Sequence, residues 1–230
     1  MNGSRMAKDP KTPNKNSFFA YTPSCRTLRS AEINGVSIKV IKGLIIEERV
    51  DVIVNWANTH LNHGTGVSGL IVHNGGTIIQ QESSAYVMKN GPLQVGEVME
   101  TQPGLLNCKT VIHAVGPIYG RESGQEEEYL KRAVTNSLKM AEDSRYESIS
   151  LPAISVGVFG YPVYDCARLM ISAIESFLLK VEVRFLSEIR LTNHEMEIWI
   201  CFEEEFDDWL QNCDSLPNTS IKSTKAAEID

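Results

Sequence analysis

Residues 50–69 read VDVIVNWANTHLNHGTGVSG, and this segment carries the main signal for the fold. It opens with the dense apolar run Val50–Val54, which is typical of a central strand covered on both faces. Two asparagines follow, and then a loop with glycine at positions 64 and 66. From about Ser68 to Glu82 the pattern predicts a helix. A helix start beyond a glycine loop presents unpaired N–H groups that suit an anion, although a tight turn without a ligand has the same pattern.

A second loop of this kind lies in LPAISVGVFGYP, residues 151–162. An apolar strand again enters a run of small residues, and Pro162 then favours the start of a helix. Phe159 stands in this loop between glycines. We expect it either to pack as an ordinary aromatic residue or to lie against a sugar or a base.

Short apolar runs alternate with amphipathic stretches along the rest of the chain. Alternation of apolar and polar residues predicts a half-buried strand over 35–41, and further strands are expected over 96–101, 110–115, 148–154 and 183–191. Helical spacing recurs over 130–141, 166–178 and 199–210. This order predicts an α/β domain with helices on both faces of a mixed, largely parallel sheet, whose ligands bind beyond the carboxyl ends of the central strands.

The composition is that of an ordinary globular protein, with 42% hydrophobic and 22% charged residues. A net charge of −7 disfavours binding to a nucleic-acid backbone. No apolar run is long enough to span a bilayer, and the first residues lack the apolar core of a secretion signal, so we expect no membrane association and a soluble, intracellular location in the cytoplasm or nucleus. Five cysteines without Cys-x-x-Cys spacing disfavour a disulfide framework and a structural zinc site.

Three regions are expected along the chain. Residues 1–28 are rich in Pro, Lys, Asn and Ser and predict a flexible leader, residues 29–212 the folded domain, and residues 213–230 a disordered polar tail. The sequence leaves the oligomeric state open.

The order of these motifs resembles one family. The strand ending in Asn55-Trp-Ala-Asn58 with its glycine loop, then VIHAVGP at residues 111–117, then the second loop, are similar to the motifs of macrodomains over about residues 33–210. QQESS at residues 80–84 and LNCKTVIHAVGP at residues 106–117 look most like macrodomains linked to ADP-ribosyltransferases, and HGTGVS at residues 63–68 looks like the binding loop of archaeal members. The resemblance implies a three-layer α/β/α macrodomain fold with a diphosphate of ADP-ribose held between the two loops.

Carried over residue by residue, the resemblance implies a set of ligand contacts. Asn58 would hydrogen-bond the distal ribose, for which a carboxamide offers both a donor and an acceptor. Phe159 would cover that ribose, and the backbone N–H of Ile45 would contact the adenine ring. The first diphosphate loop would comprise Gly64, Thr65, Gly66, Val67 and Ser68, and the second Ser155, Val156, Gly157, Val158 and Phe159.

Other positions have less definite roles. Asn55 matches an asparagine that usually braces the structure. His63 replaces a frequent glycine and is expected either to touch the terminal ribose or to be exposed in its loop. His113, in an apolar strand, is predicted to be a hydrogen-bonded core histidine. Asn193 and His194 are the candidates for the open face of the adenine, where the family often has an aromatic residue.

Three positions depart from the family pattern. Leu44 stands where an aspartate accepts a hydrogen bond from the adenine amino group, which predicts an affinity about ten- to a hundredfold lower or a looser choice of base. Trp56 replaces a small alanine and either fills a gap in the core or reshapes the pocket. Ser68 replaces an aspartate that helps orient or activate water in many hydrolytic members, and no adjacent His or Asp in the motif activates it.

These observations favour a module that recognises ADP-ribose, either free or attached to a protein partner. The alternative is a slow ADP-ribosylhydrolase, which removes mono-ADP-ribose from proteins or acetyl from O-acetyl-ADP-ribose. A further alternative is a diverged macrodomain scaffold with an altered ligand. Whether the chain is an enzyme is left open, no catalytic residue is assigned, and we expect no cofactor, metal or nucleic acid.

Overall fold

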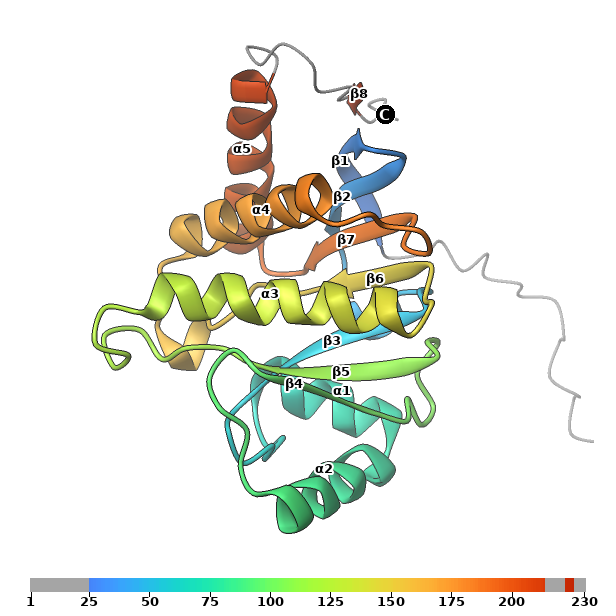
Figure 1. The fold of residues 1–230 in the computed structure, drawn as a ribbon, viewed down its shortest axis with the longest axis vertical. Coiled ribbons are helices and arrows are strands. Elements are labelled where there is room, and N and C mark those ends of the chain that lie inside the picture. Colours follow the sequence, from blue (N-terminus) through green and yellow to red (C-terminus); the bar gives the residue numbers. More distant parts are fainter. Residues whose placement is uncertain (1–24, 214–221, 226–230) are drawn as a thin grey trace, which may run out of the picture.

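The computed structural model describes residues 25–213 and 222–225. In this part of the chain, five α-helices cover an eight-stranded sheet of order β4-β5-β3-β6-β7-β2-β1-β8 (Figure 1). The strands are β1 (Arg26–Ile33), β2 (Val36–Lys42), β3 (Val52–Ala57), β4 (Val98–Thr101), β5 (Thr110–Val115), β6 (Ser148–Leu151), β7 (Glu188–Asn193) and β8 (Lys222–Lys225). The helices are α1 (Gly66–Gly75), α2 (Thr77–Asn90), α3 (Glu126–Asp143), α4 (Val163–Lys180) and α5 (Met196–Cys213), with short 3-10 turns η1 (Ile45–Glu47) and η2 (Gly157–Phe159).

The sheet is mixed and largely parallel in its centre. β2 and β7, β7 and β6, β6 and β3, and β3 and β5 pair in parallel, whereas β1 pairs antiparallel with β2 and β8, and β4 with β5. The expected three-layer α/β/α architecture is therefore confirmed. Because β3 and β6 are neighbours, the two glycine loops that follow them emerge side by side at one edge of the sheet.

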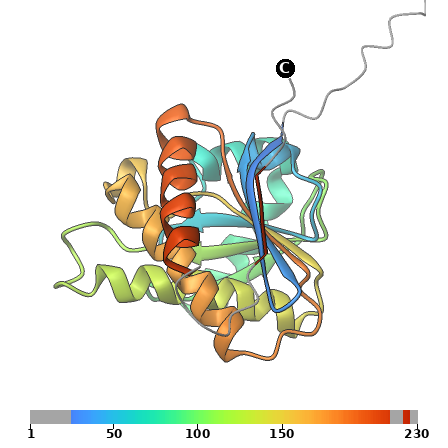
Figure 2. The same ribbon diagram turned by 90° about the horizontal axis from the view of Figure 1, so that it is seen from above.

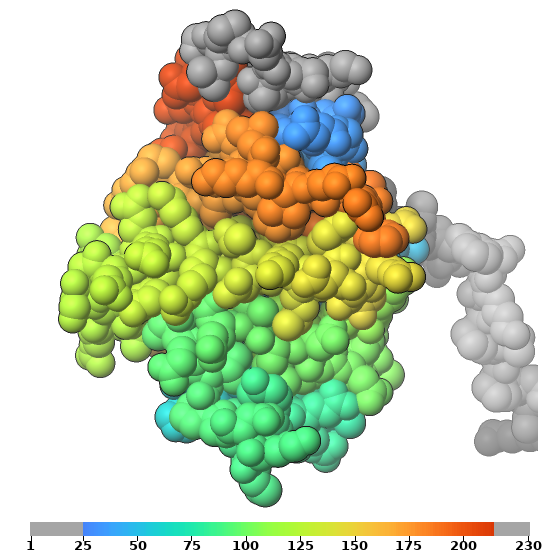
Figure 3. Space-filling model, in the orientation of Figure 1, coloured from blue at the N-terminus to red at the C-terminus, as the bar shows by residue number. Residues whose placement is uncertain are grey.

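The helices form layers on both faces of the sheet (Figure 2). The space-filling view shows α3 and α4 covering much of one face (Figure 3), and α5 packs beside α4 against β2 and β7. The opposite face carries α1 and α2. β3 is buried on both sides, as its dense apolar run predicts, because Val52 and Val54 join the core under α3 and α4 while Ile53 joins the cluster under α1.

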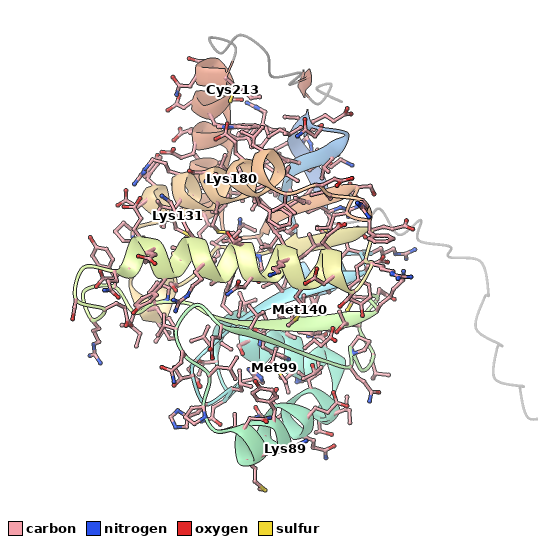
Figure 4. All side chains as sticks on the ribbon, in the orientation of Figure 1. Lys89, Met99, Lys131, Met140, Lys180 and Cys213 are labelled. Atoms are coloured by element: carbon pink, nitrogen blue, oxygen red, sulfur yellow. The ribbon has the colours of Figure 1, made fainter. Side chains whose placement is uncertain are left out.

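A smaller apolar cluster closes the β4 edge of the sheet. Met99 on β4, labelled in Figure 4, is buried there with Leu93, Ala57 and Leu61. None of the helices in the described ranges combines the length and the apolar character that crossing a bilayer requires.

The expected single helix over residues 68–82 is two helices. α1 ends at Gly75 and α2 begins at Thr77, because Gly76 between them has φ +97°, a conformation that side chains rarely adopt. Its N–H donates to the Val72 carbonyl at 2.8 Å and closes the first helix.

The expected domain boundaries differ from the structure at both ends. Residues 26–28, assigned to the leader, belong to β1, which forms a hairpin with β2 around Asn34 and Gly35. Cys213, assigned to the tail, is the last residue of α5, and residues 222–225 form β8 by pairing with β1. Main-chain pairing along an edge strand needs no apolar pattern, so the composition of the tail did not indicate that β8 pairs with β1. Residues 1–24 of the leader, and residues 214–221 and 226–230 of the tail, lie outside the described ranges.

Candidate ligand-binding site

A cavity of about 260 Å³ opens at the carboxyl edge of the sheet. Four segments line it, at or just after the carboxyl ends of β2, β3, β6 and β7. Their lining residues are Gly43, Leu44 and Ile45; Trp56, Ala57, Asn58, Asn62, Thr65, Gly66, Val67, Ser68 and Leu70; Pro152, Ala153, Ser155, Val156, Gly157, Val158 and Phe159; and Thr192, Asn193, His194, Glu195 and Ile198. All the predicted contact residues line this cavity except His63 and Gly64.

The first loop supplies backbone donors to the cavity. In α1, the N–H of Gly69 is the first to donate to a backbone carbonyl, that of Thr65, at 3.0 Å. The three N–H groups before it, of residues 66–68, have no backbone acceptor in the described chain, as expected for the first turn of a helix. A Cβ at Gly69 would lie 3.2 Å from the Gly64 carbonyl, so glycine lets α1 start close against the loop.

The second loop exposes a matching set of donors. Gly160 N–H donates to the Gly157 carbonyl at 2.9 Å, and Tyr161 N–H to the Ser155 carbonyl at 3.0 Å, so the loop closes on itself. Gly157, at φ +81°, turns the chain, and Ser155 is held at φ +55°. The N–H groups of residues 156–159 have no backbone acceptor in the described chain. Phe159 is half-buried in the cavity wall.

The cavity walls carry no Lys or Arg side chain among the described residues. Two sets of unpaired N–H groups therefore provide the positive potential, together with the N-terminal end of α1. A site of this kind can attract a compact, multiply charged anion although it has no basic side chains.

Asn58 holds the first loop in shape. Its Nδ2 donates to the Asn62 carbonyl at 2.9 Å, while its Oδ1 accepts from the N–H groups of His60 at 3.1 Å and Asn62 at 3.2 Å. These bonds fix the plane of the carboxamide at the cavity wall and leave one Nδ2 hydrogen for a ligand.

A buried polar cluster lies behind the first loop. Asn55 Nδ2 lies 2.9 Å from His113 Nδ1, and 3.2 Å from both His63 Nδ1 and Ser68 Oγ. The two imidazole rings stack at 4.6 Å between centroids, and their Nε2 atoms lie 2.9 Å from Ser83 Oγ for His63 and 2.9 Å from Thr101 Oγ1 for His113. His113 is therefore the hydrogen-bonded core histidine that the sequence predicts.

The expectations for His63 and Ser68 need correction. His63 neither lines the cavity nor is exposed in its loop, because the residue is 6% exposed and its ring packs on His113. Burial lowers the pKa of His63 to about 4 and that of His113 well below its ordinary value, so both rings are neutral at pH 7. Ser68 does have a histidine partner, since its Oγ lies 2.9 Å from His63 Nδ1.

The opposite end of the cavity, beyond β2 and β7, which we call the apolar end after its aliphatic patch, also carries the polar side chains of Thr192, Asn193, His194 and Glu195. Leu44, Ile45 and Ile198 contribute aliphatic surface there. Asn193, a candidate for the adenine face, is 6% exposed and braces β7 to the segment after β6, because its Oδ1 accepts from the Ala153 N–H at 2.9 Å. His194 remains at the rim.

Trp56 forms part of the cavity wall. Its indole N–H donates to the Pro152 carbonyl at 2.6 Å, and the ring packs against the core under α3 and α4. The indole therefore fills space in the core and also shapes the cavity, so both of the alternatives predicted from the sequence apply.

Sequence reasoning missed several lining residues, notably Asn62, Leu70, Thr192, Glu195 and Ile198. Asn62 and Leu70 stand within or beside the first loop. The last three follow from the position of β7 in the sheet, which the sequence placed too early, over 183–191 instead of 188–193. Ile198 lies one turn after Glu195, at the start of α5, which is a spacing that a helix assignment beginning at residue 196 would have identified.

Comparison with known proteins gives a consistent result. A sequence model described as "Macro domain" matches residues 54–170. An uncharacterized protein of Thermotoga maritima is 42% identical over 178 residues, which cover 77% of this chain but only 30% of that protein. A Salmonella typhimurium protein named O-acetyl-ADP-ribose deacetylase is 34% identical over 168 residues, covering 73% of this chain and 88% of that one.

Solved structures agree with the sequence relatives. The Oceanobacillus iheyensis macrodomain with ADP superposes with a TM-score of 0.77 at 28% identity, covering 82% of this chain and 98% of that one. The Trypanosoma brucei macrodomain in complex with ADP-ribose gives a TM-score of 0.66 at 26% identity, and the match covers 73% of this chain and 68% of that one.

Proposed function

The chain belongs to the macrodomain family, and on that premise we propose that it binds ADP-ribose, free or attached to a protein. The observation that carries the proposal is that two sets of backbone N–H groups without a backbone acceptor in the described chain belong to residues lining one cavity, whose described walls have no Lys or Arg side chain. A diphosphate is an anion of the size and charge that such paired loops accommodate. The structural neighbours that hold ADP and ADP-ribose support the assignment.

The two ends of the cavity suit different parts of this ligand. β2 and β3 are separated by β7 and β6 in the sheet, so three strand spacings, roughly 14 Å, lie between the two ends. We place the flat, apolar base at the end formed by Leu44, Ile45 and Ile198. The diphosphate lies between the loops, and the terminal ribose at the β3 end, beside Asn58 and Phe159.

Calorimetry with ADP-ribose, ADP and AMP tests the proposal. Gly157→Glu, which places a carboxylate at the second loop, is expected to weaken ADP-ribose binding at least about tenfold relative to Gly157→Gln, because both carry the same backbone strain and differ only in charge. A Cβ at Gly157 meets nothing within 4 Å, so both variants are expected to fold.

Gly124→Glu is the matched control for charge and strain. Gly124 has φ +84°, also meets nothing within 4 Å, and lies outside the cavity wall. The Gly124→Glu variant should bind ADP-ribose with the affinity of the parent chain. If none of the three nucleotides binds at millimolar concentration, the ligand proposal is wrong.

Slow hydrolysis is a second candidate function. The contact between Ser68 and His63 favours it, since the cavity-lining serine has a neutral imidazole partner. The deacetylase name of the Salmonella relative points the same way. Single-turnover release of ADP-ribose from a mono-ADP-ribosylated protein tests this activity. Loss of release in Ser68→Ala with ADP-ribose still bound would support it, and no release by the parent chain would exclude it.

A further inference from the structure

The buried cluster behind the first loop fixes the direction of its hydrogen bonds. Asn55 Nδ2 lies within hydrogen-bond distance of three side-chain atoms that can accept, whereas its Oδ1 is buried without a partner among the described residues. The reversed amide would leave two hydrogens unpaired instead of one acceptor, so the observed orientation costs less. Nδ2 therefore donates, and His113 Nδ1 accepts.

The same amide sets the tautomer of His63. A hydrogen on His63 Nδ1 would point toward the Asn55 NH₂ group 3.2 Å away, which places a donor against a donor. The ring hydrogen therefore sits on Nε2, where Ser83 Oγ accepts it at 2.9 Å. The depressed pKa of His63 keeps the ring neutral at pH 7, so once the single hydrogen is on Nε2 the Nδ1 atom carries none.

This tautomer determines what Ser68 presents to a ligand. The His63 Nδ1 lone pair, 2.9 Å from Ser68 Oγ, takes the hydroxyl hydrogen. Asn55 Nδ2 donates to one Oγ lone pair at 3.2 Å. Since Ser68 lines the cavity, the remaining lone pair is what it offers there. A lone pair attracts an O–H donor and repels a phosphate oxygen.

The position of Ser68, in the first turn of α1 above β3, selects the donor. It is bonded to Asn55 on β3, and His63 stacks on His113 of β5, so the cluster belongs to the β3 and β5 side. The apolar residues after β2 and β7 lie at the other end of the cavity. A ligand with its base among those residues brings its terminal sugar, whose hydroxyls are donors, toward Ser68.

We propose that His63 is a positioning residue that turns Ser68 Oγ into a hydrogen-bond acceptor for a hydroxyl of the terminal ribose. This inference rests on the ADP-ribose binding proposed above. It makes Ser68 a residue that distinguishes ADP-ribose from ADP, and gives His63 an effect on binding although its ring does not line the cavity.

A double-mutant cycle with two ligands tests the proposal. Ser68→Ala is expected to weaken ADP-ribose binding about three- to tenfold more than it weakens ADP binding. His63→Phe keeps an aromatic ring against His113 but frees the Ser68 hydroxyl, so it should also reduce the preference for ADP-ribose over ADP. In the double variant the preference should equal that of Ser68→Ala alone, because His63 acts only through Ser68.

Two results would overturn the proposal while ADP-ribose binding itself stands. Equal weakening of ADP and ADP-ribose by Ser68→Ala would show that the hydroxyl contacts the diphosphate. A loss from His63→Phe that persists in the Ser68→Ala background would show that His63 acts by another route. Binding of neither ligand by the parent chain would instead refute the proposed function, and this inference with it.

Nitrogen-15 NMR of the parent chain provides a test that needs no variant. At neutral pH the side-chain signals of His63 are expected to show hydrogen on Nε2 and an unprotonated Nδ1. The opposite tautomer would make Nδ1 a donor to Ser68 and contradict the proposal directly.

Discussion

Among single residues, two buried serines close to the cavity differ in whether their hydroxyl group is hydrogen-bonded. Ser155 Oγ is buried and has no hydrogen-bond partner in the part of the chain that the structure describes, whereas Ser150 Oγ donates to Thr192 Oγ1 at 2.8 Å. An unpaired buried hydroxyl destabilises the fold, and a paired one contributes modestly to it. Gly116 makes room for this arrangement, since a Cβ there would lie 2.2 Å from Ser155 Oγ.

The same substitution should therefore have opposite effects at the two sites. Ser155→Ala is expected to raise the free energy of unfolding of the ligand-free protein by about 1 kcal/mol, and Ser150→Ala to lower it by about 1 kcal/mol. Urea denaturation measures both. A destabilised Ser155→Ala would show that its hydroxyl has a partner, for example an ordered water.

Leu44 offers a gain-of-affinity prediction. It caps η1 at the apolar end of the cavity, and an acid there would accept a hydrogen bond from the adenine amino group. Leu44→Asp is expected to tighten ADP-ribose binding about tenfold. Inosine diphosphate ribose, which has an oxygen in place of that amino group, is the matched ligand and should gain nothing. An equal change for both ligands in calorimetry would refute the assigned base position.

Among the structural elements, η1 depends on a buried charged group. Glu48, directly after η1, is 1% exposed, and its carboxylate accepts from Thr192 Oγ1 at 2.5 Å and pairs with Arg190 at 2.5 Å. Arg190 also pairs with Glu188 at 2.8 Å. The network ties the segment after β2 to β7 and so joins the two strands that form the apolar end of the cavity.

Glu48→Gln should therefore destabilise the fold by about 2–3 kcal/mol, because it leaves the largely buried Arg190 with one carboxylate partner. Glu182→Gln is the control, since its pair with Arg184 is exposed on both sides and should contribute less than about 0.5 kcal/mol. Chemical denaturation distinguishes the two. Equal effects would mean that the buried pair adds nothing to stability.

The whole molecule should lose stability in mild acid. His63 and His113 stay neutral in the folded state, because burial lowers their pKa values, but they take up protons when unfolded below about pH 6.5. The stabilisation they give is complete above that pH and is lost as the pH falls, for His63 until its folded pKa of about 4 is reached. Each contributes about 1.4 kcal/mol per pH unit.

Between pH 6.5 and 5 the free energy of unfolding is therefore expected to fall by about 3 kcal/mol, and by about half of that in His113→Gln, whose amide keeps polar partners but does not titrate. Urea titrations across this range provide the measurement. A flat profile would show that the two rings are protonated in the folded state.

Much of the fold could be predicted from the sequence, because local pattern reports burial. β5 has the predicted bounds, the core helices α3 and α4 lie where apolar spacing put them, and β3 is buried on both faces. The β1–β2 hairpin was missed although its signal was present. Asn34 and Gly35 have φ +51° and +84°, the two positive values that a tight Asn-Gly hairpin turn requires.

The sequence by itself determined the two glycine loops, since a backbone that turns at positive φ and approaches a neighbour closely needs glycine at fixed positions. Only the tertiary structure decided what lies behind and across from them. It buried His63 against His113, gave Ser68 its imidazole partner, and brought Glu195 and Ile198 to the cavity. The stack of His63 on His113 and the approach of residues 195–198 to the first loop bring together segments far apart in the chain. The order in which strands assemble in a sheet, which decides such contacts, leaves no local mark in the sequence.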